Sequence, residues 1–174
     1  MIYFISDPHF DHTNIIEYCG RPFDTVEQMN DLIYTNWITT IKQDDIVYFL
    51  GDMSFGRNSR SAKWWLKHLT GRIVYIKGSH DKGIKGLSGL PDNVIEVTHA
   101  KIIKAKKTRF LLTHSPYLKD YYNHINMDER YDWHIHGHVH NIKPLICRKT
   151  KKINVSVETT NYCPISMDEI LNMV

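Results

Sequence analysis

The chain alternates short runs of apolar residues with longer stretches in which apolar positions recur every three or four residues. Short apolar runs are typical of buried strands, and the longer spacing is typical of helices that bury one face. The runs predict strands at 2–6, 46–50, 73–77, 101–105, 109–113, 143–147 and 152–158, and another that starts at Trp133. Helices are predicted at 25–42, 59–69 and 166–174.

Local capping signals support these helices. Thr25, with Gln28 three residues later, is a predicted N-cap for the first helix, and Ser166 with Glu169 repeats the pattern for the last. Gly71 is expected to end the middle helix.

The later strands are predicted to pair as hairpins. Three residues separate 101–105 from 109–113, and a basic turn, "RKTKK", separates 143–147 from 152–158. The early alternation of strands and helices predicts an α/β fold with a buried sheet, and the hairpins predict a second or mixed sheet.

The chain has the length of a single domain, 1–174, and its 42% of apolar residues can form a core. Neither a repeat nor a composition shift divides it. The segment 83–93, rich in glycine, is predicted to be a surface loop because strand-like sequence resumes at Val94. The polar and aromatic stretch 117–132 is predicted to be a loop with a short helix.

Net charge and cysteine content indicate which binding partners and which cellular compartment to expect. The net charge of +3 is too small to indicate a nucleic-acid partner and agrees with an anionic substrate. The cysteines, Cys19, Cys147 and Cys163, are far apart and odd in number, which favours a reducing, cytoplasmic compartment. The first apolar run stops at Ser6 without a basic segment before it, so neither a signal peptide nor a membrane span is expected.

Histidine or aspartate follows five of the predicted strands. The segments are Asp7-Pro8-His9, Gly51-Asp52, Gly78-Ser79-His80-Asp81, His114, and His136-Gly137-His138-Val139-His140. Because ligand sites in open α/β sheets lie beyond the carboxyl ends of strands, we expect these segments to meet at one edge.

This combination of side chains favours metal chemistry. Aspartate and neutral imidazole without thiolate suit Mn, Fe, Ni or Zn. Alternate residues of an extended segment point to the same side, so the pairs Asp7 and His9, and His138 and His140, can each converge on one centre. A carboxylate can bridge two ions about 3.5–4 Å apart, as in two-metal phosphoester hydrolysis, and a free histidine can protonate the leaving oxygen.

The motifs "DPH", "GDMS", "GSHD", "TH" and "GHVH", in this order from residue 7 to residue 140, resemble those of the calcineurin-like metallophosphoesterases. The short length and the segment "SDPHFDHTNII" are most similar to compact bacterial and phage phosphoesterases of this class. A lone GHxH would be a weak signal, whereas five ordered motifs are specific. The resemblance implies a sandwich of two mixed β-sheets flanked by helices, with a dinuclear metal centre at its top edge.

The resemblance also implies site residues. The first ion is assigned to Asp7, His9 and His140, the second to His114 and His138, with Asp52 as the bridge. Manganese is the expected metal, with Fe, Ni or Zn as alternatives. His80 is assigned as general acid or electrostatic stabiliser, and Asp81 as the residue that orients it. The implied reaction is attack by a metal-bound hydroxide on a phosphodiester or phosphomonoester, including a nucleotide.

One position departs from the family pattern. Ser79 stands where the family has an asparagine whose carbonyl oxygen would bind the second metal. The serine hydroxyl is shorter and a poorer ligand. Three readings stay open: Ser79 binds the metal directly or through water, it leaves a weaker second site in a working enzyme, or it is an engineered, disabling substitution. We expect the second metal to bind less tightly than the first.

Four further residues are weaker candidates for substrate binding. They are His12, Asn14, Arg21 and Arg57, which lie on loops expected to border the site, where an arginine suits bidentate binding of phosphate. A helix start for His12 and a solvated surface role for the other three are equally compatible with the sequence. His136 is expected to face the core or to lie behind the ligands.

Two other functions stay open. A non-catalytic scaffold of the same fold, as in the retromer subunit, is disfavoured because His80 is present. A nuclease is disfavoured because the DNA-processing members of this class carry appended domains, and this chain has little room beyond the catalytic core. The expected partner is therefore a small phosphorylated substrate, without membrane or nucleic acid.

Overall fold

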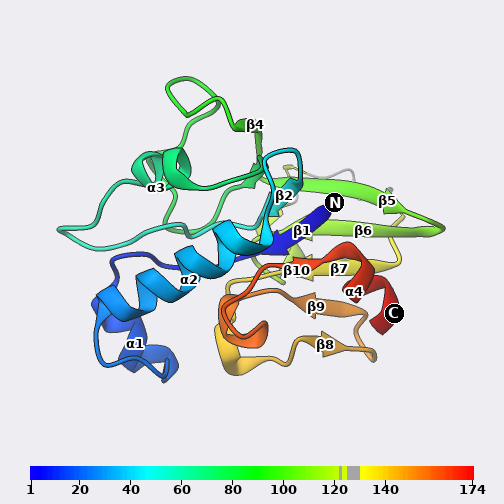
Figure 1. Ribbon diagram of the computed structural model, residues 1–174. Helices are drawn as coiled ribbons and strands as arrows, with labels where there is room; N and C mark the ends of the chain where they lie inside the picture. Colours follow the sequence, from blue (N-terminus) through cyan, green and yellow to red (C-terminus); the bar gives the residue numbers. More distant parts are fainter. Residues whose placement is uncertain (122, 125–129) are drawn as a thin grey trace.

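Two mixed five-stranded sheets form the body of the chain, and helices flank them (Figure 1). The structure is a computed structural model, and it describes residues 1–121, 123–124 and 130–174. The predicted fold class is confirmed. The first sheet has the order β10 (Ile165–Ser166), β1 (Ile2–Ile5), β2 (Ile46–Phe49), β3 (Arg72–Ile76) and β4 (Val94–Thr98). Strands β1 to β4 are parallel, and β10 pairs with β1 in the antiparallel sense.

The second sheet combines three parallel strands with antiparallel edges. Its order is β5 (Ala100–Ala105), β6 (Thr108–Thr113), β7 (Trp133–His136), β9 (Lys152–Asn154) and β8 (Ile146–Cys147). Strands β6, β7 and β9 are parallel, and β5 and β8 pair antiparallel at the two edges. Both predicted hairpins are therefore confirmed, as β5–β6 and β8–β9.

Four helices and three short 3₁₀ turns accompany the two sheets in the described part of the chain. They are α1 (Thr13–Cys19), α2 (Val26–Thr40), α3 (Ala62–His68) and α4 (Met167–Met173), with short 3₁₀ turns η1 (Leu118–Tyr121), η2 (His140–Ile142) and η3 (Val157–Thr159). Figure 1 shows α1, α2 and α3 on one side of the sheets and α4 beside the C-terminus. No helix in the described part of the chain is long and apolar enough to cross a membrane.

Side chains along the parallel strands point alternately to the two faces of the first sheet, and they form two separate hydrophobic cores. In β1, Tyr3 and Ile5 pack toward the core that includes α1, α2 and α3, whereas Phe4 packs toward the second sheet. Successive side chains of a strand point to opposite faces, so a strand covered on both sides must be apolar throughout. This requirement explains why the parallel strands appear in the sequence as uninterrupted apolar runs.

Most predicted ends lie within two residues of the observed ones. The strand predicted at 143–147 is limited to Ile146–Cys147, and the middle helix begins at Ala62, after its N-cap Ser61, and ends at His68 with Leu69 rather than Gly71 as its C-cap.

The Thr25 and Ser166 hydroxyls accept from the N–H groups of Gln28 and Glu169, the latter in a full capping box. The predicted strand 152–158 is too long: it ends at Asn154, and the chain turns into η3, where the Ser156 hydroxyl bonds to the Asn154 side chain.

Three short elements were not predicted, the two-residue strand β10 and the 3₁₀ turns η2 and η3, all too short to show a period in the sequence. Helix α1 agrees with one of the two alternatives for His12, a helix start, because His12 is its N-cap residue. Part of the predicted loop 117–132, namely 122 and 125–129, lies outside the described residues.

Candidate metal centre

The polar strand ends of both sheets meet at one edge, as the sequence predicts. Asp7 and His9 follow β1, Asp52 follows β2, and Ser79 and His80 follow β3. His114 follows β6, and His138 and His140 follow β7 of the second sheet. Strands β1, β2 and β3 are mutually parallel, as are β6 and β7, so their carboxyl ends lie together.

Among the described residues, three groups of side chains have the geometry of metal ligands: two form the predicted site, and the third, Cys19, His140 and Glu158, shares His140 with the first of them. Potential ligand atoms of each group all lie within 4.8 Å of one another; the two groups of the predicted site are Asp7, His9 and His140, and Asp52, His114 and His138. They are the same two sets that the family resemblance implies, apart from Ser79.

Asp52 lies between the two groups. Its Oδ2 atom is 3.3 Å from Nε2 of His114 in its own group and 3.6 Å from Nε2 of His9 in the other. Its Oδ1 atom accepts the backbone N–H of His80 at 2.8 Å. One carboxylate oxygen therefore faces both groups, the position that a bridging ligand needs.

Several buried polar atoms of the first group have no hydrogen-bond partner among the described residues. They are Oδ1 of Asp7 and both ring nitrogens of His9, whose residues are 0% and 2% exposed. An unpaired buried polar atom is costly, and natural proteins contain few of them. A cation held by Asp7 and His9 would satisfy these atoms, so the residues fit a metal ion.

The backbone at this edge is strained at the ligand positions. Five of the proposed ligands have positive φ angles, with values of 59° at Asp7, 49° at His9, 58° at Asp52, 70° at His138 and 46° at His140. Non-glycine residues rarely adopt this left-handed region, and such strain is concentrated at functional sites. The sharp turns direct side chains of adjacent strands into one centre.

Two glycines beside the ligands make room for them. A Cβ atom on Gly78 would collide with the Asp52 carboxylate, and one on Gly137 would collide with Ser6 and Asp7. The glycines of "GSHD" and "GHVH" are therefore required by close approach of the backbone to the carboxylates.

In the second group, a protonated His114 lies against the ionised carboxylate of Asp52. Burial acts to lower the pKa of His114, but its contact with Asp52 and the nearby Asp7 carboxylate raise that pKa to about 9. Burial acts to raise the pKa of Asp52, and contact with His114 and the charge of His9 outweigh it and hold that pKa below its ordinary value. A divalent ion must displace the proton that His114 holds, so metal binding here would release a proton.

Arg21 does not border the site as predicted; it is buried behind it. Its side chain is 0% exposed, and its five N–H groups are used by the carbonyl oxygens of Asp7 and Pro8, by Sδ of Met29 and twice by Oε1 of Glu158. The predicted alternatives, a phosphate contact and a solvated surface role, are both wrong. Arg21 instead fixes the backbone that carries the first ligands.

Glu158 is a supporting residue that the sequence does not reveal. Its Oε1 atom accepts from Nδ1 of His140 at 2.9 Å as well as from Arg21 at 2.7 Å. Burial acts to raise the pKa of Glu158, and the contacts with His140 and Arg21 instead lower it to about 2. With Nδ1 of His140 engaged, Nε2 is the nitrogen left for a metal. Such carboxylate–histidine contacts are frequent behind metal ligands.

Asp81 does not orient the His80 ring as predicted. The Asp81 carboxylate accepts from the backbone N–H groups of Gly78 at 2.7 Å, Asp52 at 2.8 Å and Met53 at 3.3 Å. It therefore joins the turns after β2 and β3. Burial and the neighbouring Asp52 carboxylate raise the pKa of Asp81.

His80 stands at the mouth of the centre with a side chain that is 41% exposed. Its Nε2 atom lies 4.0 Å from Oδ2 of Asp52, and its ring contacts Phe55 at a centroid distance of 4.2 Å. Ser79 is exposed beside it, with its hydroxyl 3.5 Å from Nδ1 of His138. Ser79 is thus next to the second group.

The other candidates lie at the rim or behind the ligands. His12 has its ring centroid 5.5 Å from that of His9, and burial lowers its pKa. Asn14 and Arg57 are exposed and line a hollow that adjoins His12. His136 is 2% exposed, as expected for a position in the core or behind the ligands.

A curated relative places the chain in a family with an archaeal member. No family model matches it. Over 178 residues it is 43% identical to the uncharacterized protein MJ1445 of Methanocaldococcus jannaschii, covering 99% of this chain and 90% of that protein. It is 29% identical over 199 residues to the gene 66 protein of Mycobacterium phage L5, covering 99% and 93%.

Solved structures give a likeness over the whole chain. The protein of unknown function AQ665 from Aquifex aeolicus has a TM-score of 0.77 and 34% identity, covering 100% of this chain and 99% of that one. Neighbours of lower likeness include an archaeal phosphodiesterase, with a TM-score of 0.43, 18% identity and coverage of 88% and 81%. Yfce, a phosphoesterase from E. coli, has a TM-score of 0.44, 16% identity and coverage of 95% and 81%. These last two likenesses are too weak to carry an argument about activity.

Proposed function

The chain belongs to the family that contains MJ1445 of Methanocaldococcus jannaschii, and for it we propose a metal-dependent phosphoesterase activity. The proposal depends on the site rather than on the relatives. Its main support is that five residues of two adjoining ligand groups adopt strained left-handed backbone conformations at one sheet edge. Such strain is concentrated at functional sites, and here it turns neighbouring aspartates and histidines toward one centre.

The first proposed ion would be held by Asp7, His9 and His140, and the second by Asp52, His114 and His138, with Asp52 facing both. When bound, two divalent ions supply Lewis-acid polarisation of phosphoryl oxygens and lower the pKa of bound water. Donor chemistry supports borderline-hard ions, since aspartate and imidazole provide the contacts. We expect Mn to activate, with Fe, Ni or Zn as the other candidates.

His80 is the proposed proton donor. It is the exposed histidine beside the bridging carboxylate, and its ring can move without breaking a buried bond. In the reaction it would hold its proton toward the leaving oxygen of the phosphoester as the phosphorus–oxygen bond breaks. Asp81 would act only through the backbone of Gly78 and Asp52, as a positioning residue.

Ser79 is the proposed weak point of the second ion site. Its hydroxyl lies beside His138 but offers a short, neutral ligand in place of an amide oxygen. We propose that the second ion is held mainly by Asp52, His114 and His138 and binds less tightly than the first.

The activity is tested with purified protein loaded with Mn and assayed on aryl phosphomonoesters and phosphodiesters. We expect hydrolysis that stops with a chelator and returns with Mn. Asp52→Asn and His80→Ala should each lower kcat by about 100-fold or more, the usual size of a general acid or electrostatic contribution. Glu96→Gln, at an exposed ion pair away from the site, is the matched control. Bound metal without turnover of any ester would instead favour the scaffold.

A further inference from the structure

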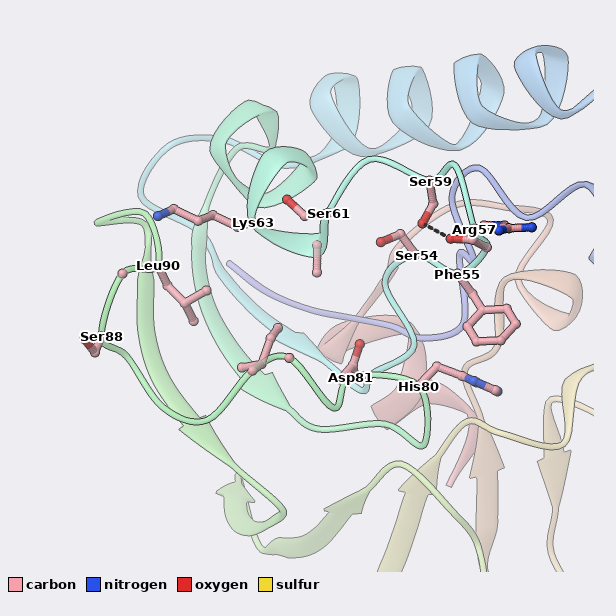
Figure 2. A pocket seen from close by; sticks show the side chains of 15 residues that line it. Ser54, Phe55, Arg57, Ser59, Ser61, Lys63, His80, Asp81, Ser88 and Leu90 are labelled. Atoms are coloured by element: carbon pink, nitrogen blue, oxygen red, sulfur yellow. Dashed lines mark hydrogen bonds between the residues drawn. The ribbon is translucent and has the colours of Figure 1, made fainter.

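Two surface hollows lie on either side of the exposed ring of Phe55. The first, which we call the His80 hollow, has a volume of about 760 Å³ and lies between residues 54–63 and the segments 80–84 and 88–90. The second, the His12 hollow, has a volume of about 560 Å³ and lies between residues 55–60 and the starts of α1 and α2. Figure 2 shows Phe55 and His80 at one end of the His80 hollow, and Lys63, Ser88 and Leu90 at the other.

Both hollows begin beside the candidate metal centre. The Phe55 ring lies 4.2 Å from the His80 ring and 4.9 Å from the His12 ring, measured between centroids. The rings of His80 and His12 each lie 5.5 Å from the ring of His9, a proposed ligand. Two routes therefore lead outward from the centre, one on each side of Phe55.

A phosphomonoester has one substituent and would leave one hollow empty, whereas a phosphodiester has two. Each hollow has the size that small-molecule sites commonly have, about 300–1,000 Å³. On the basis of the proposed function, we propose that the substrates are phosphodiesters, with one substituent in each hollow and Phe55 between them.

The charged side chains that line the two hollows differ, and this difference indicates which substituent of the phosphodiester each hollow would hold. Lys63 and Arg57 line the His80 hollow, while the carboxylate of Asp81 is engaged by backbone N–H groups. This hollow suits a polar substituent with a negative charge. Since His80 is the proposed proton donor, the substituent that leaves occupies the His80 hollow.

The His12 hollow has no such excess of positive charge. Arg57, which lines both hollows, and Arg60 are accompanied here by two carboxylates, Asp11, which pairs with Arg60, and Glu27, so the lining charges of this hollow balance. It suits a neutral polar substituent, the one that stays on the phosphate after hydrolysis.

The test fills one hollow at a time. Asn58→Trp places a large ring in the His12 hollow, and Gly83→Trp places one in the His80 hollow, where a Cβ atom meets nothing within 4 Å. The matched controls are Gly86→Trp, at a loop glycine with the same free space outside the hollow, and Asn172→Trp, on the exposed side of α4. All variants are loaded with Mn and assayed on bis(p-nitrophenyl) phosphate and p-nitrophenyl phosphate.

We expect Asn58→Trp to lower kcat/KM for the diester by about tenfold or more and to leave the monoester within about twofold, because only the diester uses both hollows. Gly83→Trp should lower kcat/KM for both esters, since both place their leaving group in the His80 hollow. The controls should resemble wild type. Unchanged diester turnover in Asn58→Trp, or equal losses for diester and monoester, would overturn the inference.

A binding measurement separates this inference from the proposed function. The rise in Tm of the Mn-loaded protein is recorded with each ester. If wild type hydrolyses neither ester, but the diester raises the Tm and Asn58→Trp removes that rise, the proposed activity is wrong and the two-hollow recognition stands. If wild type hydrolyses the monoester while Asn58→Trp leaves diester turnover and binding unchanged, the activity stands and the two-hollow inference is wrong. If neither ester is turned over or bound, both are wrong.

Discussion

Glu158→Gln isolates the contact behind the first ligand group. The Glu158 side chain is 4% exposed, and its Oε1 atom accepts from both Arg21 and His140. The substitution therefore removes a buried negative charge that both donors face. Removing one partner of a buried ion pair costs about 3–5 kcal/mol. Glutamine retains an acceptor oxygen, so we expect a loss near the lower end, about 3 kcal/mol, in the free energy of unfolding of the metal-free protein.

The same substitution should weaken metal binding at the first group. Nδ1 of His140 would lose the carboxylate that orients the ring, and loss of such a contact typically costs 10–100-fold in metal affinity, so we expect a decrease of about tenfold or more. Urea unfolding with a chelator measures the first effect, and calorimetric titration with Mn measures the second. Affinity at the second group should change little, because Glu158 contacts none of Asp52, His114 and His138 in the described structure.

Glu96→Gln is the control for a general effect of removing a carboxylate. Its ion pair with Lys101 is exposed, with side chains 40% and 31% accessible, so its removal should cost less than about 1 kcal/mol. If Glu158→Gln is as mild as this control, the reasoning about the buried pair is refuted. If it destabilises the fold but binds Mn as wild type does, Glu158 supports the fold and does not position His140.

Three further predictions concern single residues. Ser79→Asn should tighten the second Mn site and leave the first unchanged in the same titration; equal second-site affinity in both proteins would contradict the weak-site proposal. Gly78→Ala should lower metal occupancy, measured by elemental analysis, because a Cβ atom there collides with the Asp52 carboxylate, whereas Gly86→Ala should not. Burial, with His136 and Lys152, lowers the pKa of His134 to about 3, so its stabilising effect is complete above the unfolded pKa near 6.5 and is lost as the pH falls toward 3. His134→Gln should therefore reduce the acid-side slope of urea stability in chelator by about 1.4 kcal/mol per pH unit, and an unchanged slope would refute this.

The fold was predictable where each element carries its own signal. Strands β1, β2 and β3 appear as apolar runs because both faces are covered, and α2 shows both its apolar spacing and its Thr25 cap. The strand predicted at 152–158 was too long, because its end depends on side-chain contacts of Ser156 rather than on its apolar pattern. That the chain is a single domain and lies in the cytoplasm stays a prediction.

The convergence of the ligands was predictable from their place after parallel strands, but the residues that hold them were not. Arg21 and Glu158 are 137 positions apart, and neither follows a strand end with a recognisable motif. Their role follows from the same strained turn that presents the ligands. Positive φ angles at Asp7 and His9 take the chain off the sheet, and the buried carbonyl groups of Asp7 and Pro8 then need donors from elsewhere.

Arg21 supplies those donors, but a buried guanidinium in turn requires a carboxylate. Glu158 provides it, and its second contact carries the arrangement to His140 on the other sheet. The strain that brings Asp7 and His9 to the centre therefore creates the need for the pair that also positions His140. This chain of requirements appears only once the turns are seen in three dimensions. It implies that losses of metal affinity in Arg21→Lys and Glu158→Gln should not add in the double variant, because both act on one connected support.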